Sequence, residues 1–364
     1  MESFVESWDA PGLGTAVLTA GAGTFVVLRR GARVVPFDDE GRPLLWLAPE
    51  ALPGRAVAAW ASTGAWNLGA ERLWIGPEWR LMVGDRAEFL GTYALSPAMD
   101  PGDWSLDAKG AEALLSTHMR LSASQPAGRL GLDVRQKVAP AADPARRLEE
   151  SAGLRHLGWS REVTLERGEG DDGSVACQSW VLAQVQAPAT VLVPRAGPDA
   201  VTDYFEPVDD SHLRASRSGL RIDLSGRRRF KVGIRTGEHV GTVAAWREGP
   251  GDTATLLVRY FQDAPSSRYL EEPPGSPGHE GDSIYVYNDD GRFGDFGEVE
   301  ALGRALEPGA RSVHDRFEAH VWWGPRGSVA RLAGRLLHGP FGTGDKLHDT
   351  LAEPMPSSPR IDSR

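Results

Sequence analysis

Cysteine and lysine are scarce in this chain of 364 residues. Cys177 is the single cysteine, so the chain by itself forms no disulfide framework and no cysteine-based metal site. This residue stands in the apolar stretch 175–181, where a small core residue is expected rather than a nucleophile. Only four of the 40 basic residues are lysines. That bias is typical of a GC-rich genome, so the abundance of arginine carries little functional meaning.

An excess of positive charge and long apolar runs are also absent. The net charge is -10 and the pI is near 5.5, which argues against a nucleic-acid partner held through its phosphates. The one dense basic run, 227–229, lies inside a strand-like stretch. No run approaches about 18 apolar residues, so no membrane span is expected. The acidic segment 1–6 lacks the pattern of a signal peptide, which predicts a cytoplasmic protein.

Motifs for metals, cofactors and nucleophiles are missing as well. The nine histidines show no HExxH or comparable spacing, and the pair His314 and His320 lacks a third ligand. No GxSxG elbow, Walker loop or GxGxxG after a strand is present. Their absence removes the main serine-hydrolase, NTPase and dinucleotide-binding classes. We therefore expect no metal and no cofactor.

Glycine and proline, by contrast, are abundant, with 43 and 26 residues. Many turns favour a chain of short strands over a helical bundle. Strands are predicted at 23–28, 32–37, 44–47, 175–185, 190–193, 220–224, 230–234, 254–261, 283–287, 298–302 and 317–323. Their spacing suits an antiparallel sandwich rather than βαβ units.

Helical spacing is confined to a few segments. The apolar residues of 106–119 and of 328–337 recur at helical intervals, and 140–151 is typical of a surface loop or short helix. Large all-β sandwiches run past about 200 residues as one unit. We therefore expect one domain over residues 1–338 and a loosely ordered, Pro- and Ser-rich arm over 339–364.

The segment 69–78 is too polar for an ordinary strand. With its aliphatic residues facing the core, alternation turns Arg72 and Trp74 to the other face, with Glu78 in the turn that follows. An aromatic ring, an arginine and a carboxylate are a typical set for holding a sugar. The alternative is a surface Arg–Glu pair beside a core tryptophan.

Two further segments carry candidate site residues. Segment 281–291 alternates through Tyr287 and ends in a polar turn, where Asn288 and Asp289 point into a cleft, bind a hard cation such as calcium, or simply close the turn. The spaced acidic residues of an EF-hand loop are missing, so a calcium site has little support. Glu298 and Glu300 share one face of a strand, with Cα atoms roughly 6.5 Å apart. In a cleft, one of two such carboxylates has a raised pKa, which suits a general acid or base. On a solvent-facing strand they are an ordinary acidic surface.

These segments occur in a familiar order. The set 71–78, 203–205, 229–233, 281–289 and 298–300, closed by the Leu-Glu-Pro-Gly…His stretch 306–314, resembles a bacterial family related to the aldose 1-epimerases. The resemblance covers about residues 20–338. It implies an all-β fold, a large antiparallel β-supersandwich of the galactose mutarotase-like kind with a few short helices. It also implies a sugar-binding groove across one sheet.

The resemblance also suggests catalytic roles. In aldose 1-epimerases a histidine acid protonates the ring oxygen, and a glutamate late in the chain takes the proton of the anomeric hydroxyl. By position Glu300 is the better match to that base, and Glu298 is the second. The Asn-His and Tyr-Phe-Asn residues that supply the histidine are missing here, and the surroundings of His156 match nothing in the family.

The ligand implied by the resemblance is a small-molecule sugar or the end of a glycan. The cationic residues Arg72, Arg229 and Lys231 suggest an acidic or oxidised sugar. The full set of expected substrate-binding residues is Arg72, Trp74, Glu78, Arg229, Lys231, Tyr287, Asn288 and Asp289.

Three functions stay open from the sequence, which also leaves the oligomeric state open. They are mutarotation, epimerisation or a related proton transfer with Glu300 as base; sugar binding without catalysis; and a glycoside hydrolase or polysaccharide lyase. Hydrolase carboxylates flank the scissile bond, about 5–5.5 Å or about 6.5–9.5 Å apart. Glu298 and Glu300, side by side on one strand, fit a base with a tuning partner better.

Overall fold

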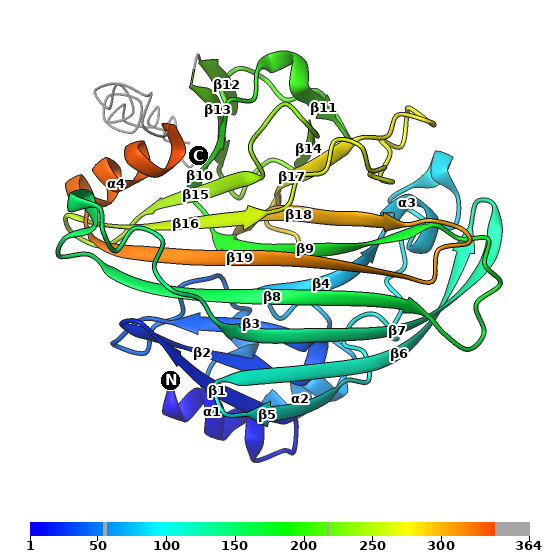
Figure 1. The fold of residues 1–364 in the computed structure, drawn as a ribbon, viewed down its shortest axis with the longest axis horizontal. Coiled ribbons are helices and arrows are strands. Elements are labelled where there is room, and N and C mark those ends of the chain that lie inside the picture. The colour runs from blue at the N-terminus through cyan, green and yellow to red at the C-terminus, as the bar shows by residue number, and fades with distance from the viewer. Residues whose placement is uncertain (54–56, 217, 339–364) are drawn as a thin grey trace, which may run out of the picture.

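The computed structural model describes residues 1–53, 57–216 and 218–338. The arm expected over 339–364 lies outside the described residues, and the division into one domain plus an arm stays a prediction. In the part of the chain that is described, two large antiparallel sheets form a sandwich (Figure 1). The predicted all-β class is confirmed. No helix within these residues is long and apolar enough to cross a membrane.

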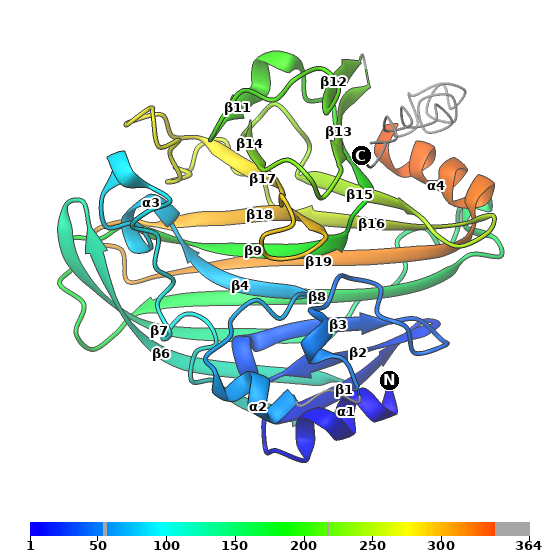
Figure 2. The same ribbon diagram turned by 180° about the vertical axis from the view of Figure 1, so that it is seen from behind.

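The first sheet has nine strands. In spatial order they are β1 (Thr15–Ala20), β2 (Gly23–Leu28), β3 (Arg33–Phe37), β4 (Glu71–Gly76), β9 (Cys177–Gln186), β18 (Phe296–Leu306), β17 (Asp282–Asn288), β14 (Phe230–Arg235) and β11 (Val201–Asp203). Strands from both ends and the middle of the chain therefore lie side by side. Figure 2 shows β4, β9, β18 and β17 from the side on which the outer face of this sheet is seen.

The second sheet has ten strands. In spatial order they are β12 (Leu213–Ser216), β13 (Gly219–Leu224), β10 (Ala189–Pro194), β15 (Thr242–Glu248), β16 (Thr253–Phe261), β19 (Ser312–Pro325), β8 (Arg155–Arg167), β7 (Ala127–Pro140), β6 (Glu112–Ser124) and β5 (Ser105–Lys109). The main apolar core lies between the two sheets and draws residues from both.

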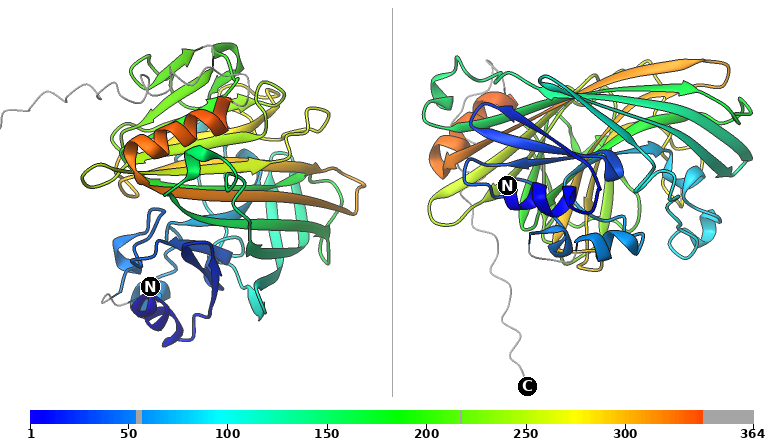
Figure 3. Two further views of the ribbon diagram at one scale, coloured as in Figure 1. Left: turned by 60° about the vertical axis from the view of Figure 1, so that its left-hand side comes forward. Right: turned by 90° about the horizontal axis from the view of Figure 1, so that it is seen from below.

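The helices are short and lie outside the sandwich. They are α1 (Glu2–Asp9), α2 (Val57–Ser62), α3 (Glu78–Leu81) and α4 (Arg326–His338). The apolar side of α4 packs on Trp246, Leu256 and Trp322, on the outer face of the ten-stranded sheet (Figure 3). The amphipathic helix predicted over 328–337 is thus confirmed. Segment 140–151 ends in a single 3-10 turn, Glu149–Ser151.

The helix predicted over 106–119 is wrong. This segment forms β5 and the first half of β6, which a tight turn at residues 110–111 joins into a hairpin, with Leu106 on β5 opposite Leu115 on β6. Buried and exposed residues alternate along most of β6, so its apolar side chains fill one face of a strand. In a short window the same leucines also satisfy a helical spacing. Pairing with β7 along the whole of β6 decides between the two.

The single thiol lies where the sequence placed it. Cys177 begins β9 and is fully buried in the main core. Burial raises the pKa of the Cys177 thiol to about 12. The thiol is therefore protonated and unreactive at neutral pH.

Candidate functional site

One row of polar side chains crosses the middle of the nine-stranded sheet. Glu298 on β18 lies opposite Gln184 on β9 and opposite Tyr287 on β17. Tyr287 in turn lies opposite Lys231 on β14. Residues directly opposed in an antiparallel pair project to the same face. The four side chains therefore stand together on one face of the sheet.

A second row runs beside the first on the same face. Arg72 on β4 lies opposite Leu182 on β9, and Leu182 lies opposite Glu300 on β18. Two residues along, Trp74 lies opposite Trp180. Because side chains alternate with period two, Trp180 shares its face with Leu182. The residues that alternate with these along each strand point the other way, into the apolar core between the two sheets.

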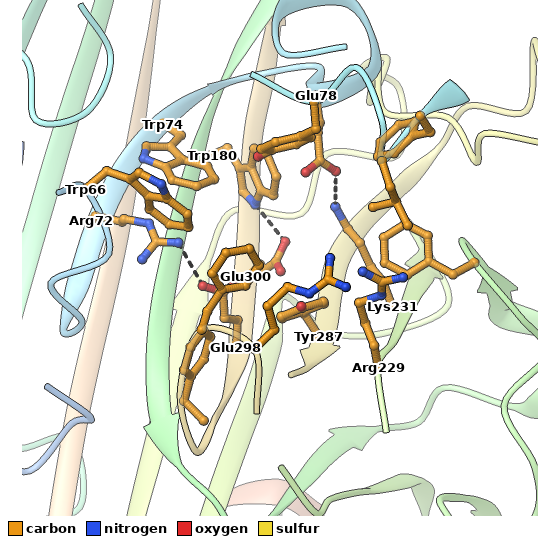
Figure 4. Close-up of a pocket in the computed structure, with 17 residues that line it drawn as sticks. Trp66, Arg72, Trp74, Glu78, Trp180, Arg229, Lys231, Tyr287, Glu298 and Glu300 are labelled. Atoms are coloured by element: carbon orange, nitrogen blue, oxygen red, sulfur yellow. Dashed lines mark hydrogen bonds and ion pairs between the residues drawn. The ribbon is translucent and has the colours of Figure 1, made fainter. Parts of the chain in front are cut away.

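These rows form the floor and walls of a cavity of about 220 Å³ (Figure 4). Every site residue predicted from the sequence lines it except Asn288 and Asp289. The lining residues are Trp66, Arg72, Trp74, Glu78, Phe89, Leu90, Tyr93, Trp180, Phe205, Arg229, Lys231, Tyr287, Arg292, Phe293, Phe296, Glu298 and Glu300. The cavity thus combines an aromatic wall with a charged floor.

Arg72 and Glu298 form a buried ion pair at one side of the cavity. Nη2 of Arg72 donates to Oε1 of Glu298 over 2.8 Å, and Nε2 of Gln184 donates to the same oxygen over 2.8 Å. The guanidinium of Arg72 lies 4.2 Å from the ring centre of Trp74. Its Nε and Nη1 have no hydrogen-bond partner among the described residues. Buried donors of this kind are costly to leave unpaired, so they favour a ligand with acceptor oxygens.

Lys231 pairs with Glu78 at the other side. Nζ of Lys231 donates to Oε2 of Glu78 over 2.8 Å and lies 4.6 Å from the ring centre of Trp180. Burial alone would lower the pKa of Lys231. The carboxylates of Glu78, Glu300 and Glu271 outweigh burial and raise this pKa above its usual value. The ammonium group therefore stays charged at neutral pH.

Glu300 is the buried carboxyl at the centre of the floor. It is 1% exposed, and its Oε2 accepts a hydrogen bond of 2.8 Å from Nε1 of Trp180. Burial raises the pKa of Glu300 to about 8; the ammonium of Lys231 opposes this shift. The neighbouring carboxylates of Glu298 and Glu78 add to it. Glu300 therefore carries a proton for most of the time at pH 7 and changes charge just above that pH.

Glu271 is a second buried acid that sequence reasoning missed. It lies behind the cavity, where its carboxylate accepts hydrogen bonds from the backbone N–H groups of Glu78 and Trp79. Burial raises the pKa of Glu271 to about 7, and the charge of Lys231 opposes the rise. No local pattern signals it, because it lies in the loop between β16 and β17 and belongs to no strand.

Asn288 and Asp289 shape the rim instead of lining the cavity. Oδ1 of Asn288 accepts from the backbone N–H of Gly226 over 3.0 Å. Oδ1 of Asp289 accepts from the hydroxyl of Tyr287 over 2.9 Å, and Oδ2 accepts backbone N–H groups of its own loop, including that of Phe293. The hydrogen bonds of both side chains thus hold the turn together. They fix the loop that places Arg292 and Phe293 at the mouth of the cavity.

The histidines lie elsewhere. No histidine lines the cavity in the described ranges. His156 and His320 form a stacked pair on the outer face of the ten-stranded sheet, with Nε2 of His156 3.1 Å from Nδ1 of His320. Burial lowers the pKa of His156 to about 4. His314 is exposed and contacts Thr164. Among the residues that the structure describes, no group of three or more His, Cys, Asp or Glu is arranged to hold a metal.

Comparison with known proteins rests on structure alone. No protein-family model matches the sequence, and no curated protein does. A crystal structure of a putative aldose 1-epimerase from Escherichia coli K12 matches 86% of this chain and 100% of its own, with 11% identity and a TM-score of 0.52. A galactose mutarotase related enzyme from Lactobacillus acidophilus matches 84% of this chain and 96% of its own, with 9% identity and a TM-score of 0.47. The first match shows that this chain has the galactose mutarotase-like fold.

Proposed function

We propose that the protein binds a single aldose in this cavity and transfers a proton at its anomeric centre, with Glu300 as the base and Glu298 as its partner. One observation carries the proposal: a buried carboxyl with a pKa near 8 lies in the floor of a small, open, aromatic-walled cavity. A general acid or base works best when its pKa lies near the working pH. The fold, shared with a putative aldose 1-epimerase, supports the same assignment.

The size and lining of the cavity suit one sugar ring. Its volume of about 220 Å³ lies below the roughly 300–1,000 Å³ typical of sites for drug-sized ligands, so it fits a monosaccharide better than a longer glycan. Trp66 is half-buried and offers an aromatic surface on which a sugar ring stacks, whereas Trp74 is buried behind it. The free N–H groups of Arg72 donate to hydroxyl oxygens, while Glu78 and Glu298 accept from hydroxyl protons.

In the proposed step, ionised Glu300 takes the proton of the anomeric hydroxyl as the bond between the anomeric carbon and the ring oxygen breaks. The ring oxygen gains a proton, and the sugar becomes an open-chain aldehyde. Rotation of the aldehyde and the reverse steps give the other anomer. Lys231 and Tyr287 lie in the lining and keep their protons at neutral pH, because both have pKa values raised above their usual range. They therefore serve as hydrogen-bond donors that stabilise the developing charge on the ring oxygen, while the proton itself comes from water.

Exchange between anomers is measured directly by NMR saturation transfer on a panel of neutral and acidic aldoses. We expect at least one aldose to exchange faster with the protein than without it, and Glu300→Gln to remove that acceleration. Glu169→Gln is the matched control, because Glu169 is exposed, pairs with Arg120 and does not belong to the described lining of the cavity. If no aldose in the panel exchanges faster, the catalytic proposal is wrong.

Sugar binding without catalysis is the second candidate. It is favoured by the lack of a histidine in the described lining of the cavity. Binding that is detected by calorimetry, without any accelerated exchange, would establish it. A hydrolase is less suited to this site, because Glu298 and Glu300 stand on one strand rather than across the cavity from each other.

A further inference from the structure

The acidic groups in the floor of the cavity are already balanced. Glu298 is paired with Arg72 and Glu78 with Lys231, each over 2.8 Å. Glu300, between them, has no ion-pair partner among the described residues and is largely protonated at pH 7. Any further positive charge in the lining is therefore not neutralised by these acids.

Two more arginines lie in the same lining. Arg229 is half-buried, and its guanidinium lies 5.7 Å from the ring centre of Phe205. Arg292 is exposed on the rim loop that Asp289 fixes. Neither arginine makes an ion pair with a carboxylate of the described chain, and the carboxylate of Asp289 is taken up by Tyr287 and backbone N–H groups. The mouth of the cavity thus has surplus positive charge.

Arg229 also lies on the opposite side of the cavity from Arg72 (Figure 4). Arg72 belongs to β4, whereas Arg229 immediately precedes β14, with β9, β18 and β17 between those two strands. A ring placed over Glu300 would therefore have its hydroxyls near Arg72 and another substituent near Arg229. Guanidinium groups are the preferred partners of carboxylate and phosphate, because their N–H donors match two oxygens at once.

We infer that the natural ligand is an anionic aldose, whose carboxylate or phosphate group is held by Arg229 and Arg292 while its ring lies over Glu300. The inference rests on the proposed function for the identity of the ligand as a sugar, but not for catalysis. It assigns the two arginines a role in specificity: they distinguish charged from neutral aldoses. Glu298 and Glu78 cannot take this role for a cationic sugar, because Arg72 and Lys231 already neutralise them.

The test is equilibrium binding to the full-length protein, followed by tryptophan fluorescence or calorimetry at low salt. The probes are glucose, glucuronate, glucose 6-phosphate, the corresponding galactose series and inorganic phosphate. We expect at least one anionic sugar to bind tenfold or more tightly than its neutral parent, and added salt to reduce the preference. The tighter of the carboxylate and phosphate series identifies the anionic group.

Variants attribute the preference to the two arginines. Arg229→Met and Arg292→Met keep the length of the side chain and remove its charge; both sites are at least partly exposed, and thermal unfolding checks that the variants fold. We expect the double variant to lose the preference for anionic sugars, with a much smaller change in the affinity for the neutral parent. Arg331→Met on α4 is the control, because Arg331 is exposed and outside the cavity.

Three results would overturn the inference. These are equal affinity for anionic and neutral sugars, a preference that survives in the double variant, and inorganic phosphate binding as tightly as every sugar tested. Anomer exchange measured on the same samples separates this inference from the proposed catalysis. If anionic sugars bind through the two arginines but no anomer exchange is seen, the inference stands and the catalytic proposal is wrong. If exchange is seen but anionic and neutral sugars bind equally well, the catalytic proposal stands and the inference is wrong.

Discussion

Glu298 and Glu300 lie two residues apart on β18 and point to the same face, yet only Glu298 is neutralised by a cation. Arg72 binds Glu298 over 2.8 Å, whereas Glu300 accepts its hydrogen bond from the neutral indole of Trp180. This asymmetry places an ion-paired carboxyl beside one that is largely protonated at pH 7. Environments that separate two carboxylates in this way are typical of acid–base sites.

The rate of anomer exchange should rise with pH through about 8. If Glu300 acts as the base, only its ionised form is active, and burial keeps that form scarce at lower pH. Exchange rates measured from pH 5.5 to 9, after subtraction of the uncatalysed rate, test this expectation. A rate that falls over the same range would show that protonated Glu300 is the acid, and the assignment as base would be wrong.

Trp180→Phe should move this pH profile to still higher pH. The indole N–H stabilises the ionised form of Glu300, so its removal raises the pKa of Glu300 further. Trp74→Phe is the matched control. It removes an indole N–H from the same wall, but that N–H donates to Asp100. A profile that shifts equally in both variants would contradict a specific effect of Trp180.

Glu300→Gln should stabilise the fold more as pH rises. Because the folded-state pKa of Glu300 is raised to about 8 from 4.5, the folded protein keeps a proton that the unfolded chain releases. The contribution of this proton to the free energy of unfolding is complete below about pH 4.5. It is lost as the pH rises to 8, by at most roughly 1.4 kcal/mol per pH unit. Glutamine does not titrate. Tm values measured for both proteins between pH 5 and 8.5 should therefore diverge; a constant difference would contradict the buried charge.

Glu71→Gln should destabilise the fold without changing the pH profile of exchange. Glu71 points into the core between the sheets, where its carboxylate accepts from Nε of Arg161 and Nε1 of Trp159, each over 3.0 Å. Arg259 lies 3.5 Å away. Two buried guanidiniums would lose their counter-charge, at a cost of roughly 3–5 kcal/mol. Chemical denaturation measures this loss.

The exposed pair of Glu169 and Arg120 is the control for that loss. Its side chains are 85% and 64% exposed, and such pairs contribute about 0–1 kcal/mol. Glu169→Gln should therefore leave the free energy of unfolding nearly unchanged. A comparable loss in both variants would contradict the structural role assigned to the buried Glu71 cluster.

Alternation and turn residues in the sequence were sufficient for the all-β class and for placing Glu298 and Glu300 on one face. They also placed Arg72 and Trp74 together, because the period of a strand is a local property of the backbone. The same local reasoning failed over 106–119, where a strand and a helix both satisfy a short apolar pattern until β7 pairs with β6.

Only the tertiary structure decided which face of the sheet carries the cavity and which of its charged side chains form ion pairs. The cavity is lined by Trp180 from a strand and by Arg292 from a rim turn, and Glu271 lies near it in a loop. No local sequence pattern connects these three residues. The pKa of Glu300 depends on burial and on Lys231, which precedes it by 69 residues in the chain. The sequence determines which side chains alternate, but long-range strand pairing sets the distances between them, and electrostatic energies depend on those distances and on burial.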